Sequence, residues 1–63
     1  MKITVNGEGL RTSKTTIAGL IEELGLRPGA VEVNLVIVSR KDYGTFRLKE
    51  GDSVEIVNFV GGG

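Results

Sequence analysis

The sequence contains neither cysteine nor histidine, it has no tryptophan, and it has a single proline. Without cysteine there can be no disulfide framework, no thiol nucleophile and no zinc-finger spacing. The absence of histidine removes the usual general base near neutral pH and the commonest metal ligand. Together these absences exclude most side-chain catalysis and soft-metal binding, so the body of the chain offers little chemistry of its own.

Charge of one sign and long hydrophobic runs are also missing. Eight Lys and Arg residues balance eight Asp and Glu residues, which argues against a dedicated nucleic-acid binder. No apolar run approaches the ~20 residues of a membrane span, and Met1 leads into Lys2 and Ile3 without a signal-peptide pattern. We therefore expect a cytoplasmic protein that binds neither nucleic acid nor membrane. Its 63 residues are enough for one domain.

The first twelve residues predict a hairpin. Apolar and polar residues alternate over Met1–Val5, the pattern of a half-buried strand. Asn6 and Gly7 follow, and this pair suits the positive φ angles of a type I′ turn. A second strand is predicted over Glu8–Thr12, where Gly9 is a candidate for a bulge.

The hydrophobic period then changes to that of a short helix over Thr16–Leu24. Thr15 or Thr16 can cap its start, and Gly25 suits the left-handed position past its end. Leu26 can then fold back onto the last turn in a Schellman motif. The predicted apolar stripe consists of Ile17, Leu20, Ile21 and Leu24.

The remainder of the chain alternates again, apart from a loop or short turn near residues 40–44. The predicted strands are Ala30–Asn34, Val36–Ser39, Thr45–Leu48 and Ser53–Val60. In the last strand, alternation places Val54 and Ile56 toward the core. The predicted order is therefore two strands, one helix and three or four further strands.

A single short helix must cover one face of a single sheet, with the first and last strands paired in parallel at its centre. This is the α+β architecture called the β-grasp, or ubiquitin-like, fold: a mixed sheet of four to five strands on one helix. We assign residues 1–60 to this domain and residues 61–63 to a flexible functional tail.

The last predicted strand runs into Gly61, Gly62 and Gly63. A glycine run contributes nothing to a core and loses the most backbone entropy on ordering. Three residues without β-carbons extend at most about 10 Å, which suits a tail that enters a narrow channel in another protein. The alternative is a cloning remnant or a trimmed linker.

Three stretches resemble the ThiS family, the sulfur carriers of bacterial thiamin biosynthesis. They are the opening residues 1–7, the strand at residues 30–34 and, most specifically, the C-terminal block at residues 47–63. The resemblance spans essentially the whole chain. One departure is the turn after Asn34, where Leu35 stands in place of the family's usual glycine.

The resemblance implies a mechanism. An E1-like (ThiF-type) adenylyltransferase would activate the Gly63 carboxylate with ATP and Mg²⁺. Sulfur from a cysteine desulfurase or rhodanese-type donor would then displace AMP. The resulting thiocarboxylate would donate its sulfur to a ThiG-type thiazole synthase. On this reading the chain is a carrier and not an enzyme, it binds no cofactor or metal, and it is a monomer when free.

Alternation also predicts a docking face. If Val54 and Ile56 face the helix, then Val57 and Phe59 point to the open face of the sheet, and Leu35 adds apolar surface. An exposed aromatic beside a reactive tail is a natural anchor for a partner. The alternative is a bulge near Asn58 that returns Phe59 to the core.

Three other functions share features of this sequence. The small subunit of molybdopterin synthase has the same fold and Gly-Gly end, but tends to be longer. A ubiquitin-like protein modifier would be joined through Gly63 to a lysine. A passive interaction module of this fold would not need a free glycine terminus, and fold analogy alone does not separate these classes.

Overall fold

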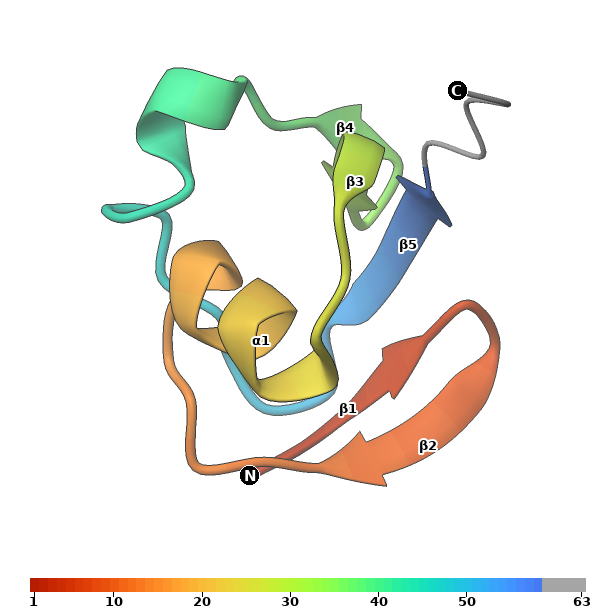
Figure 1. The fold of residues 1–63 in the computed structure, drawn as a ribbon. Coiled ribbons are helices and arrows are strands. Elements are labelled where there is room, and N and C mark those ends of the chain that lie inside the picture. Colours follow the sequence, from red (N-terminus) through yellow and green to blue (C-terminus); the bar gives the residue numbers. More distant parts are fainter. Residues whose placement is uncertain (59–63) are drawn as a thin grey trace.

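Within residues 1–58, which the structure describes, five strands form one mixed sheet and one α-helix packs across one of its faces (Figure 1). This computed structural model confirms the β-grasp fold. The strands lie side by side in the order β2-β1-β5-β3-β4. In chain order the elements are β1 (Lys2–Val5), β2 (Glu8–Arg11), α1 (Ile17–Leu24), β3 (Pro28–Val33), β4 (Val36–Ile37), a 3₁₀ turn (Arg40–Asp42) and β5 (Ser53–Asn58).

The opening hairpin has the predicted tight turn. Asn6 and Gly7 have φ angles of 51° and 85°, as a type I′ turn requires. The pairing of β1 with β2 is unbroken, and the predicted bulge at Gly9 is wrong. A β-carbon at Gly9 would lie 3.3 Å from Cε of Lys2, so glycine here leaves room for the lysine side chain to lie over the strand.

Side-chain and backbone caps define both ends of α1. At the start, the Thr16 hydroxyl accepts a hydrogen bond from the Gly19 N–H at 3.1 Å. At the end, Gly25 adopts the left-handed conformation, with φ 66°, and its N–H donates to the carbonyl of Glu22. The Leu26 N–H donates to the carbonyl of Ile21, which completes the predicted Schellman motif.

β5 occupies the centre of the sheet, parallel to β1 and antiparallel to β3. This confirms the predicted pairing of the first and last strands. The register of β3 against β5 is irregular between Pro28 and Ala30, opposite the end of β5. The extra residue, Gly29, is therefore in β3 and not in β5.

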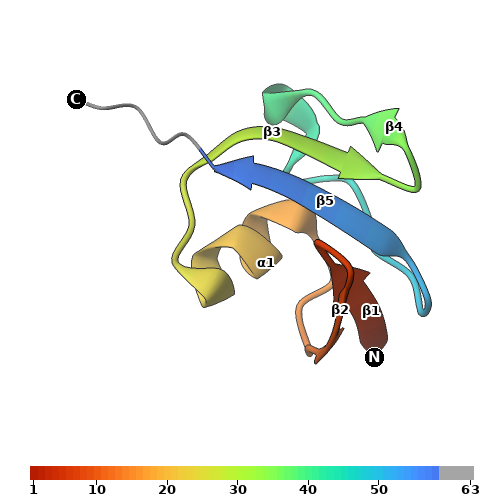
Figure 2. The same ribbon diagram turned by 90° about the vertical axis from the view of Figure 1, so that its right-hand side faces the viewer.

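The core lies between α1 and the covered face of the sheet (Figure 2). Val54 and Ile56 are buried in it, as alternation predicted. Met1, Tyr43 and Phe46 are among the half-buried side chains around its edge. The buried hydrophobic residues are Ile3, Ile17, Leu20, Val31, Val33, Val38, Leu48, Val54 and Ile56.

Two predicted strands differ from the structure. The strand expected over Val36–Ser39 is limited to Val36–Ile37. The segment Thr45–Leu48 is not a strand of the sheet: Arg47 forms an isolated bridge with Thr16, beside the start of α1. The alternation in this segment correctly predicts that Leu48 is buried. The pattern indicates which side chains face the core, but it does not indicate which strand the backbone pairs with.

Candidate functional site

The candidate site begins on β5, the strand that leads in sequence to the C-terminal glycines. Val54 and Ile56 fix one face of this strand against α1, so Glu55 and Val57 lie on the opposite face. Phe59 and the tail residues Gly61, Gly62 and Gly63 lie outside the described residues. The role of the tail, and the choice between core and docking face for Phe59, therefore stay predictions.

Two asparagine side chains, one from each neighbouring hairpin turn, hold β5 in place. Asn6 accepts a hydrogen bond from the Ile56 N–H at 2.7 Å, and its amide donates to the Ile56 carbonyl at 3.1 Å. Asn34 accepts from the Ser53 N–H at 2.9 Å, and its own amide donates to the buried carboxylate of Asp52 at 3.0 Å. These contacts hold β5 at its first residue, Ser53, and again at Ile56, two residues before its end at Asn58.

The predicted docking residues Val57 and Leu35 are both exposed, Val57 at 61% and Leu35 at 86%. Val57 lies on the sheet face away from α1, and Leu35 lies at the tip of the β3–β4 hairpin. Exposure permits contact with a partner, and their role in binding stays a prediction.

Sequence reasoning missed two further exposed apolar residues, Val36 and Ile37. Together with Val38 they form a continuous apolar run, the pattern of a strand buried on both faces. In the structure β4 is a short strand at the edge of the sheet, so only Val38 enters the core. No signal within the run distinguishes its exposed from its buried members.

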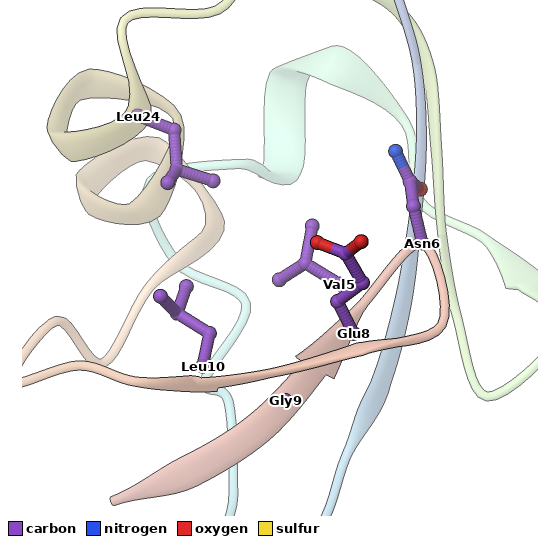
Figure 3. Close-up of a pocket in the computed structure, with 6 residues that line it drawn as sticks. All are labelled: Val5, Asn6, Glu8, Gly9, Leu10 and Leu24. Atoms are coloured by element: carbon purple, nitrogen blue, oxygen red, sulfur yellow. The ribbon is translucent and has the colours of Figure 1, made fainter.

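An open cavity of about 240 Å³ lies between the β1–β2 hairpin and the end of α1. Figure 3 shows Val5, Leu10 and Leu24 facing its interior, with the carboxylate of Glu8 beside them. A single carboxylate among aliphatic side chains provides neither a paired acid and base nor an activated nucleophile. The cavity therefore has no catalytic constellation.

Within residues 1–58, no group of three or more acidic, histidine or cysteine side chains is placed to hold a metal ion. In the same part of the chain, every buried side-chain nitrogen and oxygen has a hydrogen-bond partner. No helix among the described residues is long and apolar enough to cross a membrane. The buried polar side-chain atoms of the described residues are thus all hydrogen-bonded within the domain. The chemistry predicted from the sequence depends on the residues after Asn58.

Comparison with solved structures supports the same fold. A crystal structure of the thiamine biosynthesis protein ThiS from Geobacter metallireducens matches with a TM-score of 0.82 and 29% sequence identity, covering the whole of both chains. A solution structure of a thiamine biosynthesis protein from the same organism matches with a TM-score of 0.79. That match covers all of this chain and 88% of the other.

Among curated proteins, a thiazole synthase of Magnetococcus marinus is 47% identical over 66 aligned residues, and one of Paramagnetospirillum magneticum is 44% identical. Both alignments cover all of this chain but only 20% of the relative, so the chain spans about a fifth of their length. The model of the ThiS family matches residues 3–63, from β1 through the terminal glycines. The chain therefore belongs to the ThiS family.

Proposed function

We propose that this chain is the sulfur carrier for formation of the thiazole of thiamin, and that the Gly63 carboxylate is the group that carries sulfur. The observation that carries the proposal is the extent of the family match, which runs through the glycines to residue 63. Further support comes from the related Geobacter protein, which is described as a thiamine biosynthesis protein.

The proposed chemistry begins at the C-terminal carboxylate. An α-carboxyl has a pKa of about 3.5, so at neutral pH it is a carboxylate that can attack the α-phosphate of ATP. Pyrophosphate leaves, and the carboxylate becomes a mixed anhydride with AMP. The terminal sulfur of a persulfide on the donor then attacks the acyl carbon, and AMP leaves. A thiol reductant cleaves the resulting acyl disulfide, so that Gly63 ends as a thiocarboxylate and the donor cysteine as a disulfide with that thiol.

In this scheme the carrier is a cosubstrate and not an enzyme. ATP and Mg²⁺ are bound by an E1-like adenylyltransferase, and a cysteine desulfurase or rhodanese-type protein supplies the sulfur. The described domain contributes a rigid support: β5 is buried on one face and is fixed by Asn6 and Asn34. We place the free carrier in the cytoplasm as a monomer.

The proposed sulfur acceptor is a thiazole synthase. The curated proteins from Magnetococcus marinus and Paramagnetospirillum magneticum carry that name, and each contains a segment similar to this entire chain. A polypeptide that contains both a carrier-like segment and a thiazole synthase is the arrangement expected if the two proteins bind each other during sulfur transfer.

Intact-mass measurement tests the proposal. The chain ending at Gly63 is incubated with ATP, Mg²⁺, the adenylyltransferase of its source organism, a cysteine desulfurase, cysteine and a thiol reductant. We expect a mass gain equal to the replacement of one oxygen by sulfur, located at Gly63 by fragmentation.

A carrier extended by one alanine after Gly63 is the matched control. It should gain no mass, because its free carboxylate is one residue further along and is next to a β-carbon, which a channel that fits glycine does not admit. Isopeptide-linked adducts without thiocarboxylate would show a protein modifier instead. An unreacted terminus would favour a passive interaction module.

A further inference from the structure

Two glutamates face each other directly across the central strand pair. Glu32 of β3 and Glu55 of β5 are Cα partners in the register. The neighbouring pairs, Val31 with Ile56 and Val33 with Val54, are buried against α1. Because side chains alternate along each strand, both glutamates lie on the sheet face away from the helix.

This arrangement opposes the stability of the free domain. Side chains directly opposite one another across two strands have Cβ atoms about 5 Å apart, and like charges at such positions are destabilising. Thr4 of β1 and Ser53 of β5, which are register partners on the same face, carry no charge. The acidic pair is therefore unfavourable for the fold, unless a positive charge is brought to it.

The surroundings of the pair are apolar and exposed. Ile37 of β4 is the register partner of Glu32 on its other side and is 73% exposed. Val57 lies on the same face as Glu55, two residues further along β5, and is 61% exposed. Figure 2 shows α1 on one side of β3 and β5, and no helix or strand among residues 1–58 covers the other face. The result is a pair of carboxylates bordered by two exposed aliphatic side chains.

We propose that Glu32, Glu55, Ile37 and Val57 form a docking surface for an arginine side chain of the thiazole synthase. A guanidinium group presents several N–H donors in one plane, so it can bind two carboxylates at once. Its flat faces are weakly hydrated and pack against aliphatic groups such as those of Ile37 and Val57. The inference rests on the proposed function. We choose the thiazole synthase over the adenylyltransferase as the partner, because two proteins named thiazole synthase contain a segment similar to this chain.

The position of the surface fits sulfur delivery. Glu55 and Val57 belong to the strand that leads in sequence to Gly63. A partner held on this face is engaged within a few residues of the reacting terminus. The acidic pair then orients the carrier, while the tail reaches the acceptor's site.

The test is the double variant Glu32→Gln, Glu55→Gln, which removes both charges and keeps the side-chain size. We expect its affinity for the thiazole synthase of the source organism, measured by titration calorimetry, to fall about tenfold or more. Its dependence on salt should fall as well. The thermal midpoint of the free variant should rise by about 2–4 °C, because the repulsion is gone.

The matched control is Glu8→Gln, Glu22→Gln, which removes the same charge away from the open face. It should leave the affinity unchanged, and an equal loss in both variants would overturn the proposal by showing a general charge effect. Unchanged affinity of the first variant would overturn it too.

A second variant, Glu55→Lys, separates the effect on stability from the effect on binding. It creates an opposite-charge pair with Glu32, so the domain should be more stable while binding to the thiazole synthase is lost. If this variant still binds the thiazole synthase, or if it loses only its binding to the adenylyltransferase, the acidic pair is not a docking surface for the thiazole synthase. If the wild type forms a thiocarboxylate and delivers its sulfur to the thiazole synthase, but the double variant binds that enzyme as tightly as the wild type, this proposal fails and the carrier function stands. If no thiocarboxylate forms, the carrier function itself fails.

Discussion

Leu35 occupies a position that disfavours its side chain. It follows Asn34 in the two-residue turn between β3 and β4, and both residues have positive φ, 51° for Asn34 and 71° for Leu35. A β-carbon in the left-handed region costs about 1–2 kcal/mol. Asparagine tolerates this conformation, whereas leucine has no local hydrogen bond to offset it. The side chain is also 86% exposed, so burial does not compensate.

Replacement of Leu35 by glycine should therefore stabilise the domain. The gain should be about 0.5–1 kcal/mol, because relief of the left-handed strain exceeds the added entropy of the unfolded chain. Denaturant titration with an unchanged slope measures it. Leu35→Ala keeps the β-carbon and should give no comparable gain. Equal midpoints for the two variants would show that strain is not the cause.

At the scale of the element, β5 combines two roles that need different surroundings. One face packs against α1 through Val54 and Ile56, and the other carries exposed residues, among them Val57, for which we propose a docking role. The asparagines at the two hairpin turns reconcile these roles, because they bind the β5 backbone through their side chains. Asn6 in particular satisfies both the N–H and the carbonyl of Ile56.

The variant Asn6→Asp should destabilise this strand. The carboxylate can still accept from the Ile56 N–H, but it cannot donate to the Ile56 carbonyl and places negative charge beside that oxygen. We expect a loss of about 1–3 kcal/mol in the free energy of unfolding, with faster amide exchange along β5. Asn58→Asp adds the same charge to an exposed residue of the same strand and should have little effect. Similar losses of unfolding free energy in the two variants would show that the Asn6 hydrogen bonds to Ile56 do not stabilise the strand.

Most elements could be predicted from local patterns. The I′ turn at Asn6 and Gly7 and the caps of α1 follow from residue chemistry alone, and the structure has both. The failures lie where a tertiary partner decides the outcome. Arg47 pairs with Thr16 rather than with the sheet, and the irregularity of register falls at Gly29 rather than at Gly9. Alternation identifies buried side chains, but the choice of backbone partner depends on the whole fold.

For the molecule as a whole, we propose that the described domain supports the tail and that the chemistry takes place at the terminus. Family membership and the exposure of Val57 and Leu35 agree with the sequence-based expectations. The pairing of Glu32 with Glu55 could not be predicted, because it depends on the register of two strands whose paired residues lie 23 positions apart in the sequence. The fold brings the residues of such a surface together from separate strands, so the residue pattern of one strand does not predict it.

We propose that sulfur passes through Gly63 to the thiazole, and a label chase follows that transfer. The carrier is charged using cysteine labelled with radioactive sulfur, purified, and mixed with the thiazole synthase and its other substrates. We expect the label to leave the carrier and to appear in the thiazole product in equal amount, with Gly63 returned as a carboxylate. Label that stays on the carrier, or a labelled thiazole formed equally well with the alanine-extended chain, would contradict it.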